Sequence, residues 1–157
     1  MYKPYTVAFF GHRRLEQSMQ VEQRLEVLVL DLLRQHDEVA FLVGRNGDFD
    51  ILAASVVRRM RAACGDRRST LTLVLPYMTA EYRDNEEAFN RYYDAVEIFP
   101  APPGMPHRAC IPLRNRAMID QSDAIIRYAE HPGGALEAVE YARAQGRSIL
   151  SAAPGCI

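Results

Sequence analysis

The chain has 157 residues, and its 19 lysines and arginines nearly balance its 20 aspartates and glutamates, for a net charge of -1. This length allows one domain whose folding buries roughly two thirds of the unfolded surface, so neither a disulfide nor a metal is required. The balanced charge excludes a global field that would draw the protein onto nucleic acid or an anionic membrane, so a nucleic-acid partner is disfavoured.

The three cysteines, Cys64, Cys110 and Cys156, are scattered and form no C-x-x-C pair. An odd number at such spacing argues against a disulfide framework and against a zinc site, so we expect no metal and a reduced, cytoplasmic compartment. The N-terminal apolar run is too short for a signal peptide, and no segment approaches the ~20 apolar residues that cross a bilayer. We therefore expect no membrane partner.

The first half of the chain predicts alternating strands and helices. Residues 5–10 form a short buried strand that stops at Gly11, because β-branched and aromatic residues crowd together there. Apolar residues at helical spacing from Leu15 onward predict a long amphipathic helix. A second strand at 39–43 leads into a loop with two glycines, and Asp48 or Asp50 can cap the helix that follows.

A third strand is predicted at 71–75, where Pro76 stops it. Asp84 and Glu87 then resemble a capping box for a short helix that carries an aromatic group, Phe89, Tyr92 and Tyr93. Residues 96–99 can form a fourth strand. We expect the aromatic group to pack in the core or at a subunit interface rather than to stack on an adenine.

After a proline-rich loop at 100–107, Pro112 suits the first turn of a helix that ends near Gln121. A fifth strand is predicted at 123–128, a last helix at 135–145 with Gly146 as its C-cap, and a last strand at 148–150. The repeated order of strand, glycine-bearing loop and helix predicts an α/β fold with a mainly parallel sheet.

Glycine-bearing loops are expected to gather at the carboxyl ends of the strands, where such sheets bind ligands. Gly133 and Gly134 precede a helix whose free N–H groups can hold an anion, and Gly11 has the same position with His12 and Arg13 beside it. Two such loops predict a phosphorylated ligand. G-x-G-x-x-G and the P-loop motif are both absent, so neither an ordinary nicotinamide dinucleotide site nor a P-loop is supported.

Four stretches together resemble the YpsA-like branch of the SLOG superfamily, which takes its name from DNA-processing protein A and the LOG enzymes: FFGHRR at 9–14, FLVGRNGDFDILAASVV at 41–57, LVLPY at 73–77 and the segment 114–149. The resemblance covers nearly the whole chain in order. It implies one domain over 1–157, a Rossmann-like three-layer sandwich, a homo-oligomer and a nucleotide or nucleotide-derived small-molecule ligand. We expect no separate cofactor.

The resemblance also places the ligand-binding residues. The F-x-G-H-R element falls on Gly11, His12 and Arg13, and the G-x-x-G-x-D element on Gly44, Gly47 and either Asp48 or Asp50. The remaining elements are the R-N pair and the glycine pair with its following residue: Arg114, Asn115, Gly133, Gly134 and Ala135. Ala135 stands where the family commonly has threonine, so one hydroxyl donor is lost while the backbone nest remains.

Two classes of function stay open. LOG enzymes cleave the N-glycosidic bond of nucleoside monophosphates and carry P-G-G-x-G-T-x-x-E, whereas this chain lacks the G-T pair and holds Ala138 at the glutamate position in one register. Glu137 and Glu140 lie close to that position. A sensor or ligand-handling module needs only the glycine loops, whereas a hydrolase needs a carboxylate aimed at the sugar. We expect the sensor.

Overall fold

The computed structural model describes residues 3–65 and 68–155, and its six strands form one sheet in the order β4-β3-β2-β1-β5-β6. All five strand pairings are parallel, so the predicted α/β architecture is confirmed. The strands are β1 (Tyr5–Gly11), β2 (Glu38–Val43), β3 (Arg68–Leu75), β4 (Ala95–Ile98), β5 (Ala124–Tyr128) and β6 (Ser148–Ser151). The helices are α1 (Ser18–Gln35), α2 (Asp48–Ala63), α3 (Ala80–Asp84), α4 (Glu86–Tyr92), α5 (His107–Asp120) and α6 (Gly134–Ala144).

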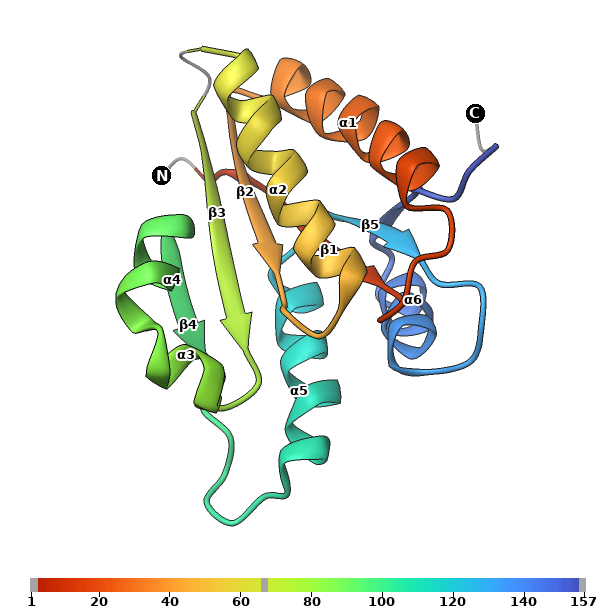
Figure 1. The fold of residues 1–157 in the computed structure, drawn as a ribbon. Helices are drawn as coiled ribbons and strands as arrows, with labels where there is room; N and C mark the ends of the chain where they lie inside the picture. Colours follow the sequence, from red (N-terminus) through yellow and green to blue (C-terminus); the bar gives the residue numbers. More distant parts are fainter. Residues whose placement is uncertain (1–2, 66–67, 156–157) are drawn as a thin grey trace.

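Alternate residues of the central strand belong to two separate cores. Val7 and Phe9 of β1 pack with α1, α2 and the aromatic residues of α3 and α4, whereas Ala8 and Phe10 pack with α5 and α6. This follows from the period of two in a strand, which sends successive side chains to opposite faces. Helices therefore cover both faces of the sheet, which gives the predicted three layers (Figure 1).

The strand order reverses between β1 and β5. From β1 the chain builds outward through β2, β3 and β4, and it then returns to the other side of β1 with β5 and β6. The loops that leave β1 and β5 consequently turn toward opposite faces, and a crevice opens between them at the carboxyl ends. A backbone hydrogen bond of 3.2 Å from His12 N to Tyr128 O joins the two strand ends at this point.

Three local predictions are wrong in their details. Helix α5 begins at His107, so Pro112 lies inside the helix and not in its first turn. Asp84 and Glu87 form no capping box: α4, which carries Phe89 and Tyr92, has Asn85 at its N-cap and no side-chain cap hydrogen bond. The side-chain cap belongs to the preceding α3, where the Thr79 hydroxyl accepts from Tyr82 N at 3.1 Å, and no side chain caps α2. The glycine stop of α6 is confirmed: Gly146 has φ +75° directly after the helix end.

The aromatic group Phe89, Tyr92 and Tyr93 packs against the first core, with Phe89 9% and Tyr93 2% exposed. Cys64 and Cys110 are free thiols, and Cys156 lies outside the described residues. None of the helices within residues 3–65 and 68–155 is long and apolar enough to span a bilayer.

Candidate functional site

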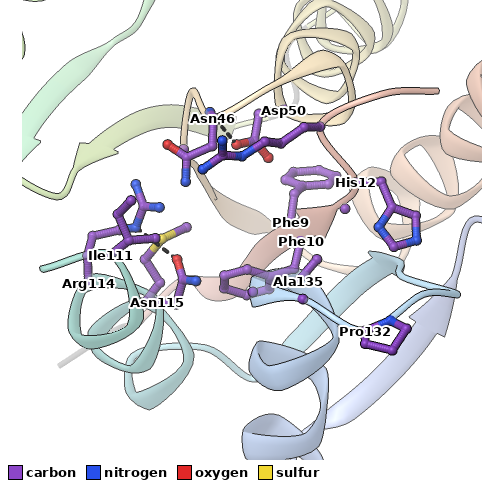
Figure 2. A pocket seen from close by; sticks show the side chains of 16 residues that line it. Phe9, Phe10, His12, Asn46, Asp50, Ile111, Arg114, Asn115, Pro132 and Ala135 are labelled. Atoms are coloured by element: carbon purple, nitrogen blue, oxygen red, sulfur yellow. Dashed lines mark hydrogen bonds between the residues drawn. The ribbon is translucent and has the colours of Figure 1, made fainter. Parts of the chain in front are cut away.

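A cavity of about 280 Å³ lies at the carboxyl ends of the central strands. Its walls come from four places: the end of β1, the loop between β2 and α2, one side of α5, and the loop that leads into α6 (Figure 2). Its volume is near the small end of the usual range for ligand sites, roughly 300–1,000 Å³. The lining residues are Phe9, Phe10, Gly11, His12, Arg13, Gly44, Asn46, Asp50, Ile111, Arg114, Asn115, Met118, Pro132, Gly133, Gly134 and Ala135.

Gly11 is required for packing inside the protein. A Cβ at this position would lie 2.1 Å from Cγ of Phe49, so the ring occupies the space that any larger residue would need. Gly47 has a similar role, since a Cβ there would lie 2.4 Å from the Cα of Arg13. These two glycines allow the start of α2 to close onto the end of β1, and this contact positions one wall of the cavity.

His12 holds the loop that leads into α6. Its Nε2 accepts hydrogen bonds from the backbone N–H groups of Glu130, at 2.7 Å, and His131, at 3.2 Å. A ring nitrogen that accepts carries no proton, so His12 is neutral with its proton on Nδ1. Desolvation, with a second contribution from His131, lowers the pKa of His12 and favours this form. His12 lies at the cavity, but its Nε2 is occupied within the protein.

The start of α6 lines the cavity, and the N–H groups of its first residues have no hydrogen-bond partner among the described residues. Gly133 has φ +151°, a conformation that favours glycine, and its carbonyl accepts the first helical bond from Glu137 N at 3.0 Å. The N–H groups before Glu137 are among the orphan donors of a helix start, where the macrodipole also favours an anion. A Cβ on Gly134 would meet nothing within 4 Å, so open space lies over this turn.

Asp50 lies at the cavity, in the first turn of α2. Its Oδ2 accepts from Asn46 N at 2.9 Å, and the residue is only 9% exposed. Burial raises the pKa of Asp50 to about 6, although the Asn46 N–H and the charge of Arg114 both act in the opposite direction. No other carboxylate lines the cavity among the described residues.

Arg114 is the most deeply buried charge of the site, with 2% of its surface exposed. It donates from Nη1 to the carbonyl of Val74 at 2.8 Å and from Nε to Oδ1 of Asn115 at 2.9 Å. These bonds fix the guanidinium against the end of β3, and Figure 2 shows Arg114 and Asn115 projecting from α5 beside the cavity. The R-N pair lies in the middle of this helix rather than near its start.

The cavity brings together ten of the twelve residues that the sequence proposes. Gly47 and Asp48 do not line it; Oδ2 of Asp48 instead accepts from Leu15 N at 3.1 Å and ties two loops together. Sequence reasoning missed six lining residues, Phe9, Phe10, Asn46, Ile111, Met118 and Pro132. Asn46 lies between the two proposed glycines, and this position was the one signal that could have found it.

Glu137 and Glu140, the two glutamates that a hydrolase reading would use, are both exposed on α6 and do not line this cavity. Glu137 lines a smaller hollow between α5 and α6. Ile111, Asn115 and Gly134 line both hollows, so Glu137 lies beside the cavity, whereas Glu140 lines neither.

Comparison with known proteins finds no matching family model and no matching curated sequence. Solved structures do match. DNA processing protein A from Streptococcus pneumoniae is 19% identical with a TM-score of 0.72, over 98% of this chain and 52% of that one. DNA processing protein A from Helicobacter pylori, described for its single-stranded DNA binding mode, is 17% identical with a TM-score of 0.67, over 94% and 65%.

The molybdenum cofactor carrier protein of Chlamydomonas reinhardtii is 10% identical with a TM-score of 0.61, over 95% of this chain and 76% of that one. The chain thus spans about half of the pneumococcal protein and just under two thirds of the Helicobacter protein. At these identities the likeness concerns the fold.

The prediction that nucleic acid is disfavoured as a partner is wrong. It rested on the balanced net charge, yet DNA processing protein A of Helicobacter pylori has this fold and a single-stranded DNA binding mode. A net charge near zero therefore does not exclude nucleic acid for this architecture, because a local patch is enough to bind phosphates. The resemblance drawn from the sequence is confirmed at the level of the fold. The chain has a Rossmann-like fold similar to that of DNA processing protein A and the molybdenum cofactor carrier protein.

Proposed function

We propose that residues 1–157 form a nucleotide-binding domain that holds a phosphorylated, nucleotide-derived small molecule in the cavity and acts as a sensor or ligand-handling module. The observation that carries the proposal is the start of α6, where unpaired amides and open space over Gly134 lie at the cavity. A phosphate is the anion that such a helix start holds best. Arg13, exposed at the same cavity, supplies a permanent charge for it.

The sensor reading is preferred to the hydrolase reading because Glu137 and Glu140 lie outside the cavity. Incubation with nucleoside monophosphates and ADP-ribose, followed by chromatography, tests for free base or ribose phosphate. We expect slow or absent release. Robust release that disappears in Asp50→Asn, Glu137→Ala or Glu140→Ala would favour the hydrolase.

Binding is tested by calorimetry with a fixed panel: AMP, GMP, ADP, ADP-ribose, pyrophosphate, the molybdenum cofactor and a single-stranded oligonucleotide. The last two are included because one structural neighbour is described for its single-stranded DNA binding mode and another as a molybdenum cofactor binding protein. Gly134→Val places a side chain in the open space of the cavity, so we expect it to abolish binding while the melting temperature stays unchanged. Equal affinity in the parent and Gly134→Val would contradict the proposed site.

Three further points are proposals at present: the YpsA-like branch, the cytoplasmic location and the homo-oligomer. The buried aromatic group no longer supports an oligomer, since Phe89 and Tyr93 are covered within one chain. The resemblance alone supports it. Light scattering at micromolar concentration decides the matter, and a mass of 17.8 kDa would exclude the oligomer.

A further inference from the structure

Two charged side chains meet at the inner wall of the cavity. A Cβ on Gly44 would lie 3.1 Å from Nη1 of Arg114 and 3.1 Å from Oδ2 of Asp50, so both groups lie over the same glycine. No ion pair within 4 Å joins them among the described residues. The two charges are close enough to interact electrostatically, but they form neither a hydrogen bond nor an ion pair with each other.

Each group keeps one polar atom free. Arg114 uses Nε and Nη1 within the protein, while no described residue accepts from Nη2. Asp50 uses Oδ2 for Asn46, while no described residue donates to Oδ1. Neither free atom is fully buried. Among the described residues, the fully buried side-chain atoms without a hydrogen-bond partner belong to Ser69 and Arg127. Because both residues line the cavity, these atoms are available to a ligand.

The pair is electrically neutral at neutral pH. Arg114 carries a permanent positive charge, and the Asp50 carboxyl, whose pKa is raised to about 6, is mostly ionised at pH 7.5. A phosphate dianion placed beside this carboxylate would meet like-charge repulsion in a poorly solvated site. A neutral group that both accepts and donates hydrogen bonds would satisfy Nη2 and Oδ1 together.

Apolar side chains from β1 and α5 also line the cavity. Phe10 and Met118 are buried to 5% and 1% exposure and belong to the core against which Ala135 packs, and Ile111 lines the cavity as well. Such walls suit a flat ring or the carbon face of a sugar. The amides that suit a phosphate lie at the start of α6, whereas Asp50 and Arg114 project from α2 and α5.

We propose that Asp50 and Arg114 determine specificity by binding the neutral, hydrogen-bonding part of the ligand, its sugar or base, and so direct the phosphate outward to the start of α6. This inference rests on the proposed function of the cavity. It adds an orientation for the ligand and a requirement that the inner group donate at least one hydrogen bond.

The test compares Asp50→Asn with Asp48→Asn, a matched control on the same turn of α2 that lies outside the cavity. AMP, GMP and pyrophosphate are the probes, with calorimetry at pH 7.5. We expect Asp50→Asn to weaken AMP or GMP about ten- to a hundredfold, the effect of losing a charge-assisted hydrogen bond, and to leave pyrophosphate within about twofold. Asp48→Asn should leave all three affinities unchanged.

Tighter binding of both nucleotide and pyrophosphate by Asp50→Asn would overturn the inference, because it would mean that the carboxylate repels a phosphate at the inner end. Unchanged nucleotide affinity would overturn it as well. The two proposals fail separately: loss of binding in Gly134→Val together with tightening in Asp50→Asn retains the cavity and rejects the orientation. If the parent binds none of the probes, the proposed function fails and the inference fails with it.

A second measurement needs no substitution at Asp50. In ¹⁵N-labelled protein, the amide of Asn46, which donates to Oδ2 of Asp50 and lines the cavity, should show nuclear Overhauser contacts to base or ribose protons of the bound nucleotide. Contacts from these protons only to residues at the start of α6 would reject the orientation.

A pH series adds a third check: between pH 7.5 and 5.5 the nucleotide affinity of the parent should fall more than that of Asp50→Asn. Arg114, Arg13, Tyr93 and His12 are the other charged or titratable groups around Asp50 and the cavity.

Discussion

Replacing His12 by alanine removes the acceptor for two backbone amides and should release the loop before α6. The bonds from Glu130 N and His131 N to Nε2 are 2.7 and 3.2 Å long, and a neutral hydrogen bond contributes about 0.5–1.5 kcal/mol net. Both amides belong to exposed residues that water can reach, so we take the lower half of the range, about 1–2 kcal/mol for the pair. This free energy should appear as local opening rather than as global unfolding.

Ligand affinity should fall with the population of the closed loop. If the closed loop is the binding-competent state, about 1.4 kcal/mol of lost stabilisation lowers the affinity up to about tenfold, depending on how stable the closed loop was. His12→Gln is the conservative variant, because its amide oxygen can reach toward the same two amides. His36→Ala is the matched control, since His36 stacks on Tyr5 at 3.8 Å near the other end of the sheet.

The assay is hydrogen exchange of the segment 129–135, read by mass spectrometry, together with calorimetry on the tightest-binding nucleotide of the panel. His12→Ala should accelerate exchange in this segment alone, His12→Gln should restore part of the protection, and His36→Ala should leave it as in the parent. Unchanged exchange and unchanged affinity in His12→Ala would refute the reasoning, because the two hydrogen bonds would then contribute nothing to the loop.

The same contact predicts a pH dependence. The pKa of His12 is lowered in the folded protein by desolvation and by His131, so the unfolded state takes up a proton first as the pH falls. The contribution of His12 is therefore fully present above the ordinary value of ~6.5 and is lost as the pH falls below it toward the lowered value. Protection of the loop at pH 7.5 should exceed that at pH 5, and His12→Gln should lose this difference.

Glycine substitutions give the remaining predictions. Gly11→Ala should destabilise the protein by about 1–3 kcal/mol, because its Cβ would overlap the ring of Phe49 at 2.1 Å; chemical denaturation measures this, and Phe49→Leu in the same chain should restore part of the loss. Gly133→Ala should be strained by its φ of +151° and lose about 1 kcal/mol or more, with weaker nucleotide binding, whereas Gly104→Ala, with φ +80° and no cavity contact, should lose stability alone. Arg13→Ala should weaken nucleotide binding about ten- to a hundredfold without a change in melting temperature.

The parallel sheet could be predicted because β1, β2 and β3 are apolar runs that stop at a glycine or proline, at Gly11, Gly44 and Pro76. Pro112 misled the helix prediction for a physical reason: proline is best tolerated in a first turn, but the tertiary contacts of Cys110, Arg114 and Met118 hold α5 on both sides of it. Capping was misplaced for a similar reason. Aspartate is a common N-cap residue, yet Asp50 lies inside the first turn of α2. Its Oδ2 accepts from Asn46 N, and the side chain lines the cavity.

Part of the site could be predicted because Gly11, His12, Gly44 and Gly133 lie at or after the ends of strands, whereas Arg114 and Asn115, inside α5, came from the resemblance alone. The apolar walls could not be predicted: Ile111 lies before the helix start that the sequence predicted at Pro112, and Phe9, Phe10 and Met118 look like ordinary core residues. The role of His12 was also out of reach, since the partners of Nε2 lie 118 and 119 residues away along the chain. Sequence spacing can indicate that a histidine lies in a loop, but its hydrogen bonds depend on which other loop lies beside it in the folded protein.

The walls of the cavity are drawn from residues 9 to 135, so no single supersecondary unit of the chain contains the site. A ligand can bind only after β1, β2, β5, α5 and the start of α6 have all assembled, which makes binding a reporter of complete folding. By mass action, a ligand at a hundred times its dissociation constant would stabilise the whole unit by about 2.7 kcal/mol. For a chain of this length that corresponds to a rise of roughly 5–10 °C in melting temperature. A thermal-shift screen should therefore detect the natural ligand through unfolding alone, without any assay of activity.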